Sequence, residues 1–308
     1  MAIPVIDFSK LNGEERAQTL AQIAKGCEEW GFFQLINHGI PEEVLERVKK
    51  VSSECYKLER EENFKNSKAV KLINELAEKK SGEKLEHVDW EDVFTIMNDN
   101  EWPVKTPGFR ETMTEYRTGL KNLAERIMEV MDENLGLPNG YMKKALNGGD
   151  EDNAFFGTKV SHYPPCPYPE LVNGLRAHTD AGGVILLFQD DKVGGLQMLK
   201  DGEWIDVQPL PNAIVINTGD QIEVLSNGRY KSCWHRVLSF PDGNRRSIAS
   251  FYNPPLNATI YPAPKLVEKE NQEVDDTYPK FVFGDYMSVY AEQKFLSKEP
   301  RFQAVRAV

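Results

Sequence analysis

The feature that most constrains the fold is a change of hydrophobic period near residue 154, from helical spacing to short alternating runs. Runs of β-forming residues then follow one another as far as residue 260, at 156–162, 184–189, 196–199, 204–207, 213–217, 222–225, 231–238 and 247–252. Turn-forming pairs that end in glycine separate several of them, at 173–174, 201–202, 227–228 and 242–243. Many short strands with such turns are typical of a closed or double-sheet structure, so this segment predicts a jelly-roll core.

The segments on either side of this core have a largely helical pattern. Before it, the sequence predicts strands at 3–8 and 32–36 and helices at 14–30, at 41–60 and from 109 to Gly136. Residues 66–86 are polar and give no clear prediction, whereas 278–308 is again helical and is expected to cover one mouth of the core. The expected class is α+β, a double-stranded β-helix with flanking N-terminal helices and a C-terminal helix. We divide it into a support region at 1–150, a core at 151–260 and a covering segment at 261–308, which form one compact unit.

Charge and composition narrow the possible partners. The chain of 308 residues has 37 basic and 48 acidic side chains, a net charge of −11, which argues against a nucleic-acid or anionic-membrane partner. Its longest apolar run, 184–188, is five residues, whereas a membrane-spanning helix needs about 20, and no secretory leader is apparent. The four cysteines are far apart without a CxxC pair, so we expect reduced, mostly buried thiols. A cytoplasmic protein with a small-molecule ligand is expected.

Three residues form a candidate metal site. His178 and Asp180 are two apart in a predicted strand, so their side chains share a face, and His235 lies on a later β run that a jelly roll can place beside the first. Two histidines and one carboxylate form a facial triad that suits non-haem Fe(II), although zinc also occupies open three-ligand sites. By spacing alone, a hydrogen-bonded structural histidine is the commoner outcome, and for His38 and His87 we expect a structural role.

Basic residues near the candidate triad predict a seat for an anion. Arg245 and Ser247 are two apart at the start of a strand, so they can clamp a carboxylate together. Lys159 interrupts an apolar alternation, and Arg176 precedes His178 by two residues. Each feature alone is ordinary for a surface side chain. Together they predict a cationic pocket in an acidic protein, which selects small carboxylates.

With these residues in place, the sequence resembles the plant iron(II)-dependent dioxygenase superfamily and, within it, the 1-aminocyclopropane-1-carboxylate (ACC) oxidases, which form ethylene. The resemblance covers nearly the whole chain, and its densest segments are CEEWGFFQLINHGIP at 27–41, FGTKVSHYPPCP at 156–167, GLRAHTDAGGVILLFQDDKVGGLQ at 174–197, WIDV at 204–207, INTGDQIEVLSNGRYKS at 216–232, SIASFYNP at 247–254 and KEPRF at 298–302. The HxD pair with a distant histidine is shared by the superfamily. Lys159 and the run 176–183 are more particular to ACC oxidases.

The resemblance implies an activity and a set of site residues. The activity is the oxidation of ACC by O2 to ethylene, CO2 and cyanide, with ascorbate as cosubstrate, bicarbonate or CO2 as activator and no obligate protein partner. His178, Asp180 and His235 would hold Fe(II), to which ACC binds through its amino and carboxylate groups. Catalytic roles fall on Lys159, Arg176, Arg245 and Ser247, and binding roles on Tyr163, Gln189, Asn217, Phe251, Lys298, Glu299 and Arg301. The last three are expected to close the site.

Two further expectations concern the walls of the pocket. Val184, Leu186 and Phe251 are expected to exclude bulk water. His162 stands where many family members have Asn before Tyr-Pro-Pro, and we do not count it as a ligand.

Other functions remain open at this point. The nearest is a 2-oxoglutarate-dependent dioxygenase acting on a hormone or flavonoid, in which Arg245 and Ser247 seat the oxoacid. A zinc hydrolase using the same triad and a binding module with a silent metal site are the others.

Overall fold

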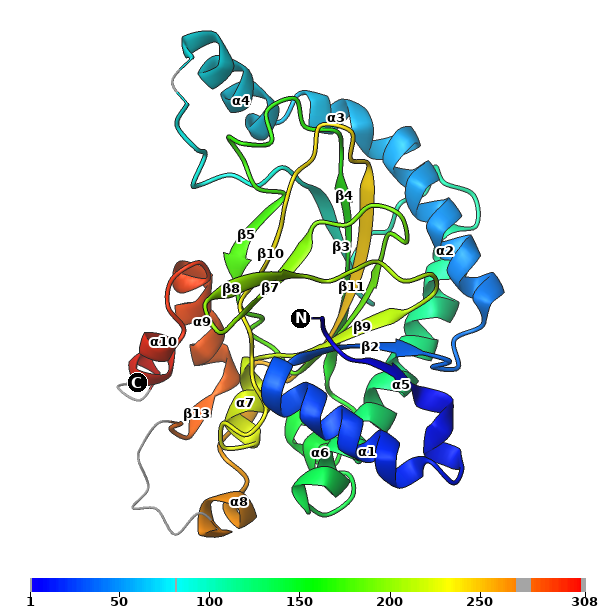
Figure 1. Ribbon diagram of the computed structural model, residues 1–308, viewed down its shortest axis with the longest axis vertical. Coiled ribbons are helices and arrows are strands. Elements are labelled where there is room, and N and C mark those ends of the chain that lie inside the picture. The colour runs from blue at the N-terminus through cyan, green and yellow to red at the C-terminus, as the bar shows by residue number, and fades with distance from the viewer. Residues whose placement is uncertain (1, 81, 270–277, 306–308) are drawn as a thin grey trace.

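The computed structural model describes residues 2–80, 82–269 and 278–305 (Figure 1). Its strands are β1 (Val5–Asp7), β2 (Phe32–Ile36), β3 (Asp92–Ile96), β4 (Phe155–Tyr163), β5 (Leu175–His178), β6 (Val184–Gln189), β7 (Leu196–Lys200), β8 (Glu203–Asp206), β9 (Ile214–Thr218), β10 (His235–Val237), β11 (Arg245–Asn253), β12 (Thr259–Ile260) and β13 (Phe281–Val282). Its α-helices are α1 (Arg16–Lys25), α2 (Glu42–Cys55), α3 (Glu61–Lys65), α4 (Lys68–Lys79), α5 (Phe109–Leu135), α6 (Tyr141–Asn147), α7 (Asp220–Leu225), α8 (Pro264–Lys269), α9 (Phe283–Gln293) and α10 (Glu299–Ala304). A short 3-10 helix, η1 (Phe8–Asn12), and two short π-helices, η2 (Gly26–Trp30) and η3 (Tyr56–Arg60), adjoin them.

Two facing sheets form the centre of the molecule and confirm the predicted jelly-roll core. In the described ranges, the major sheet has seven strands in the order β1-β2-β9-β6-β11-β4-β3, and the minor sheet has four in the order β5-β10-β7-β8. Pairing is antiparallel throughout both sheets except between β1 and β2. Because strands from before residue 150 lie at both ends of the major sheet, the first part of the chain completes the same sheet as the core.

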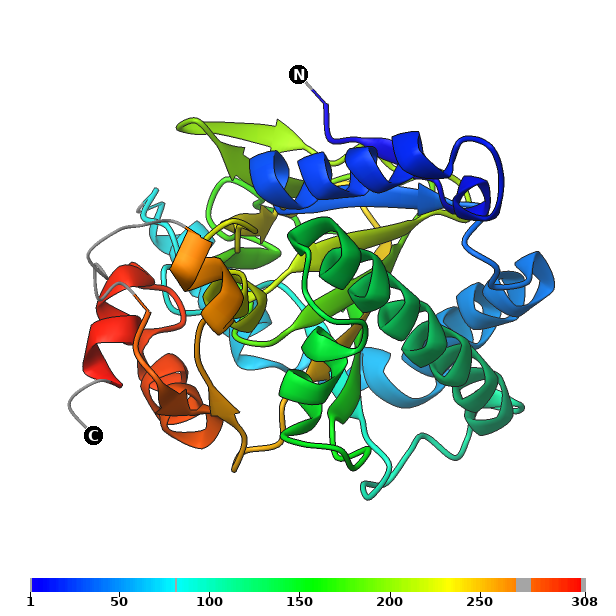
Figure 2. The same cartoon turned by 90° about the horizontal axis from the view of Figure 1, so that it is seen from below.

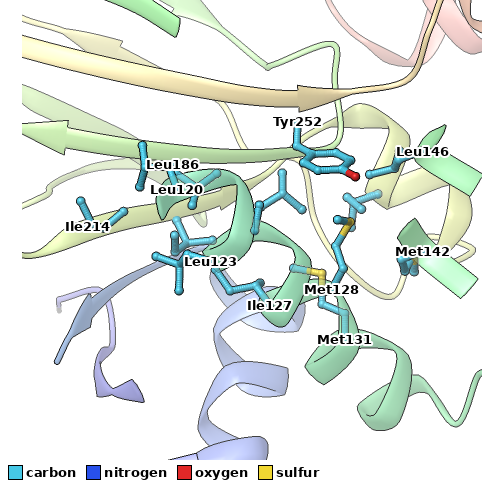
Figure 3. Packing of buried hydrophobic residues seen from close by; sticks show 14 of the residues in the cluster. Leu120, Leu123, Ile127, Met128, Met131, Met142, Leu146, Leu186, Ile214 and Tyr252 are labelled. Carbon is cyan, nitrogen blue, oxygen red and sulfur yellow. The ribbon is translucent and has the colours of Figure 1, made fainter. Parts of the chain in front are cut away.

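Helix α5 covers the outer face of the major sheet and anchors it. Its apolar stripe is buried, and Figure 3 shows Leu120, Leu123 and Ile127 of this helix in one cluster with Leu186 of β6 and Ile214 of β9. Figure 2 shows α5 crossing beneath the sheet with α6 beside it. The helix ends where Gly136 adopts a φ of 69°, a left-handed conformation that glycine reaches without strain, as the sequence predicted.

Several elements differ from the sequence prediction. Residues 222–225 were expected to form a strand but belong to α7, because a short, mostly apolar stretch fits a single buried helical turn as well as a strand. The polar segment 66–86 contains α4, whose Ser67 caps the helix by accepting from the Val70 backbone. The expected strand 231–238 is paired only over β10.

The C-terminal part is helical, as expected. Helices α9 and α10 lie together at one side of the molecule next to β5 (Figure 1). Residues 306–308 of the predicted helical tail lie outside the described residues. None of the helices in the described ranges is both long and apolar enough to cross a lipid bilayer.

Candidate metal centre and active site

The candidate metal ligands converge on the inner side of the minor sheet. His178 ends β5 and His235 begins β10, and the two residues are direct partners across this antiparallel pair. Asp180 lies beyond the end of β5, so a turn rather than a shared strand face brings its carboxylate into place. The Nε2 atoms of His178 and His235 lie 3.6 and 3.5 Å from the two carboxylate oxygens of Asp180. One ligand atom from each residue falls within 4.8 Å of the others.

The surroundings prepare these side chains to bind a divalent metal. The Nδ1 atoms of His178 and His235 lie 2.9 and 3.1 Å from the carbonyl oxygens of Arg176 and Cys233, so each Nδ1 carries the proton and each Nε2 keeps a free lone pair. Burial lowers the pKa of His178 well below its ordinary value, which keeps the ring neutral. Asn217 donates to Asp180 Oδ2 at 2.8 Å. Two imidazoles that present Nε2 and one oriented carboxylate fit Fe(II).

The turn that carries Asp180 is fixed by the start of α7. The backbone nitrogens of Gly219, Asp220 and Gln221 donate to the carbonyls of Gly183, Asp180 and Gly182 at 2.8, 2.8 and 2.9 Å. A Cβ atom at Gly219 would overlap the backbone of Gly182, so only glycine permits this approach. The start of α7 therefore sets the position of the carboxylate ligand.

A cavity of about 260 Å³ lies against the triad between the two sheets and α9. Of the residues predicted from the sequence, it is lined by Lys159, Tyr163, His178, Asp180, Asn217, His235, Arg245, Ser247 and Phe251. Strand alternation explains the set, because the lining residues of β4 and of β11 are two apart along each strand. On β6 the expected phase was wrong: Ile185 and Leu187 face the cavity, whereas Val184 and Leu186 are buried in the core with α5.

Arg245 provides the most distinct anion seat in this cavity. Its guanidinium is almost completely buried, at 1% exposure, and lies 5.2 Å from the centre of the Tyr163 ring. Nη2 donates to Gln189 Oε1 at 3.1 Å, which places Gln189 beside Arg245 although it does not itself line the cavity. Nε and Nη1 have no hydrogen-bond partner among the described residues. A buried cation with two free donors fits a carboxylate or a bicarbonate.

The other two predicted cations are already neutralised by acidic residues. Lys159 Nζ lies 3.0 Å from Glu91 Oε1, which also accepts from the Tyr163 hydroxyl at 2.8 Å. Arg176 Nε donates to Asp89 at 2.9 Å, its guanidinium lies over the Phe295 ring, and it does not line the cavity. The site is therefore less cationic than the sequence suggested, since the acidic partners lie on the segment before β3.

Helix α9 contributes cavity residues that the sequence analysis did not identify. Met287 and Tyr290 of α9 and Lys294, the residue that follows it, line the cavity. Burial, together with the nearby Lys159, lowers the pKa of Lys294 below its ordinary value. Helical spacing was the only sign in the sequence, and it shows that the three share a face without showing what that face covers.

The three predicted tail residues lie behind the cavity and do not line it. Lys298 Nζ donates to Glu223 Oε2 and to the Ser232 carbonyl, both at 2.7 Å. Arg301 is fully buried and donates to the Thr179 hydroxyl at 2.9 Å, whereas Glu299 is exposed.

The remaining histidines are not among the converging metal ligands. His162 faces the opposite side of β4, stacks on Tyr56 with ring centres 3.6 Å apart and contacts Asn244 at 2.5 Å. Burial lowers the pKa of His162 to about 4. His38 contacts the Asn212 carbonyl at 2.8 Å, and His87 is exposed. The four cysteines are free thiols, of which three are buried.

Comparisons with known proteins agree with this geometry. Residues 155–254 match the model of the 2OG-Fe(II) oxygenase superfamily, and 3–115 match that of the non-haem dioxygenase in morphine synthesis N-terminal family. The chain is 72% identical to 1-aminocyclopropane-1-carboxylate oxidase 5 of Arabidopsis thaliana and 70% identical to 1-aminocyclopropane-1-carboxylate oxidase of Musa acuminata, with 100% of each chain covered in both comparisons.

A solved structure shares the same architecture. The crystal structure of JOX2 in complex with 2OG, Fe and JA matches with a TM-score of 0.81 and 32% identity, over 99% of this chain and 89% of that one. Family models, full-length relatives and the His-Asp-His centre agree. The chain therefore belongs to the 1-aminocyclopropane-1-carboxylate oxidase family of the 2OG-Fe(II) oxygenase superfamily.

Proposed function

We propose that this enzyme oxidises ACC with O2 to ethylene, CO2 and hydrogen cyanide, with ascorbate as the reductant and bicarbonate or CO2 as an activator. The observation that carries the proposal is the identity of 70–72% to ACC oxidases over the entire length of the chain. The products, the reductant and the activator follow from the resemblance of the sequence to this family. A cytoplasmic location and the absence of an obligate protein partner stay predictions.

The electron balance explains why a reductant is needed. ACC, O2 and ascorbate together give ethylene, CO2, hydrogen cyanide, dehydroascorbate and two waters. Reduction of O2 to two waters takes four electrons, of which fragmentation of ACC supplies two and ascorbate the other two.

The metal would be held by His178, Asp180 and His235, whose lone pairs already point toward one another. When bound, Fe(II) supplies the one-electron chemistry through which dioxygen reacts with a spin-paired organic substrate, and its open positions hold reactants together. Asn217 keeps the Asp180 carboxylate oriented, and the carbonyls of Arg176 and Cys233 fix the two imidazole tautomers.

Other residues of the cavity bind and orient the reactants. The free Nε and Nη1 donors of Arg245 would hold a carboxylate or bicarbonate, and Ser247 lies on the same face of β11. Glu91 holds Lys159 and Tyr163, which lie on the same face of β4. Lys159 can therefore exchange its bond to Glu91 for one to an anionic reactant without crossing the cavity.

Apolar side chains exclude bulk water from the reaction. Ile185, Leu187, Leu196 and Phe251 line the cavity between its polar groups. A dry cavity strengthens the hydrogen bonds of Arg245 to an anion and protects reactive species from side reactions.

The rival function is a 2-oxoglutarate-dependent dioxygenase, and one observation favours it: a solved structure of the same fold is described with 2OG and Fe. A gas-phase assay of the purified full chain with Fe(II), ACC and ascorbate separates the two. Ethylene formed without 2-oxoglutarate supports the proposal, whereas succinate formed from 2-oxoglutarate and no ethylene supports the rival. An otherwise identical reaction under nitrogen is the control: no ethylene should form there, and loss of ACC without ethylene indicates zinc-type hydrolysis.

A further inference from the structure

A buried ion pair joins the last helix to the start of α7. Arg301 of α10 and Asp220, the first residue of α7, both have fully buried side chains, and Nη1 lies 3.3 Å from Oδ2. Two charges withdrawn from water cost free energy unless each is well compensated by hydrogen bonds. A pair at this position therefore calls for a role beyond charge balance alone.

Asp220 Oδ2 accepts from three different parts of the chain. Besides Arg301, the donors are the Tyr286 hydroxyl of α9 at 2.6 Å and the Thr179 hydroxyl at 3.2 Å. The backbone nitrogen of Asp220 also donates to the carbonyl of Asp180 at 2.8 Å. One carboxylate thus contacts α9, α10 and the turn that carries a metal ligand.

Thr179 is the residue between the two ligands His178 and Asp180. Its hydroxyl accepts from Arg301 at 2.9 Å and donates to Asp220, and its carbonyl accepts from the Tyr290 hydroxyl at 2.7 Å. The hydroxyl and the carbonyl of this residue are therefore held by the C-terminal helices or by Asp220. A shift of α9 or α10 cannot occur without breaking bonds to the residue that separates the two ligands.

Arg301 is not placed to bind a reactant itself. It does not line the cavity, and its Nη2 donates to the carbonyls of Lys294 and Leu296 at 3.1 and 2.8 Å. These bonds also fix the segment that follows α9, which carries Lys294 into the cavity. The contribution of Arg301 therefore passes through Asp220 and Thr179.

We propose that Asp220 is a positioning residue that couples docking of α9 and α10 to the geometry of the metal ligands His178 and Asp180. Because such coupling is reciprocal, metal binding stabilises the docked helices to the same extent that the docked helices strengthen metal binding. The inference rests on the iron site of the proposed function but not on the identity of the substrate.

The test has two measurements on the full chain. The first is the affinity for Mn(II), added without substrate or cosubstrate, and the second is the hydrogen exchange of residues 283–305. Asp220→Asn keeps the shape of the side chain but removes the negative charge to which Arg301 and the hydroxyls of Tyr286 and Thr179 donate. We expect its Kd for Mn(II) to rise about 10- to 100-fold, the range found when groups that orient metal ligands are replaced. Residues 283–305 should exchange faster, and added Mn(II) should protect them less than in the wild type.

Asp92→Asn is the matched control, because Asp92 forms a half-buried ion pair with Arg60 at 2.6 Å, on the edge strand β3. It should leave both the Mn(II) affinity and the electron paramagnetic resonance spectrum of bound Mn(II) unchanged, whereas Asp220→Asn should alter both. Equal weakening in the two variants, or wild-type affinity and exchange in Asp220→Asn, overturns the inference.

If Asp220→Asn does not fold, Tyr286→Phe decides, since it removes one donor to Asp220 Oδ2 and keeps the ring. Weaker Mn(II) binding with faster exchange of 283–305 supports the inference, and wild-type values for both overturn it. Asp180→Ala serves as the reference for the metal site itself. Loss of Mn(II) binding there, with wild-type behaviour of the Asp220 and Tyr286 variants, keeps the iron site and rejects only the coupling.

Discussion

Asp180 is the one carboxylate of the three-residue metal site, and its side chain is held by Asn217 while its backbone is held by α7. Alanine at this position removes the negative charge and an oxygen ligand but leaves the backbone bonds of the turn in place. We expect Asp180→Ala to abolish ethylene formation and to weaken Fe(II) binding by at least about 100-fold, with an unchanged circular dichroism spectrum. Near-normal ethylene output from the folded variant contradicts the assignment of this ligand.

Arg245 allows a second prediction, about geometry rather than charge. Lysine keeps the positive charge, but its ammonium group lacks the planar, two-pronged donor geometry of the guanidinium. In Arg245 two of those donors, Nε and Nη1, have no hydrogen-bond partner among the described residues. Arg245→Lys should lower kcat/KM for ACC by about 10- to 100-fold, equivalent to about 1.4 to 3 kcal/mol of transition-state binding. Fe(II) affinity should stay at the wild-type value. Ser247→Ala, on the same face of β11, provides a comparison in which charge and fork are both retained. Unchanged kinetics for Arg245→Lys remove this residue from the anion seat.

Single residues show what the sequence could and could not reveal. The convergence of His178, Asp180 and His235 was expected from the family resemblance, because spacing alone favoured structural histidines. Glu91 was not predictable, since an acidic residue before an edge strand is ordinary and its partner Lys159 lies 68 positions away. Lys294 was missed for the same reason, because only the folded chain brings α9 to the mouth of the cavity.

At the level of elements, strands with clear alternation and the long amphipathic helix were predicted well. Errors fell on short elements such as α7, where three of the residues 222–225 are apolar and two of those are β-branched. All six residues of α7 are buried, so its sequence shows no alternation of apolar and polar residues. A helical turn and a buried strand therefore look alike in sequence. The alternation of β6 was also ambiguous, because each of its residues is buried. Its phase depends on which face meets α5.

The junction of α5 and α6 gives a prediction about pH. Asp132 is fully buried in α5, where its Oδ1 accepts from the Met142 backbone at 3.0 Å, and burial raises the pKa of its carboxyl from 3.8 to about 6. Because the native state then holds the proton more tightly than the unfolded state, stability falls as pH rises from about 4 to about 6. The ionised carboxylate costs the native state up to about 3 kcal/mol at pH 7.

Asp132→Asn should remove this dependence, since the amide keeps an oxygen for Met142 and cannot ionise. We expect its gain in unfolding free energy over the wild type to widen between pH 5 and pH 7 and to stay constant above that. Urea unfolding at several pH values measures the gap. A gap that is constant from pH 5 to pH 7, or one that narrows, contradicts the account.

On the scale of the whole molecule, the major sheet is built from both halves of the chain. Strand β2 pairs with β9, β3 pairs with β4, and α5 buries the outer face between them. A segment limited to 151–260 would expose two sheet edges and most of the apolar core. We expect this segment alone to lack a cooperative thermal transition, whereas the full chain unfolds in one. A native-like, cooperative transition of the isolated segment would show instead that the first 150 residues form a dispensable support.

The whole account depends on a ferrous ion held by two imidazoles and one carboxylate that line this cavity. Crystals grown and soaked with Fe(II) without oxygen, and recorded on both sides of the iron absorption edge, test it most directly. We predict one anomalous peak about 2.0 to 2.2 Å from His178 Nε2, His235 Nε2 and an Asp180 oxygen, with its remaining positions free of protein ligands. Iron located elsewhere, or iron at this point enclosed by further side chains, would contradict the account.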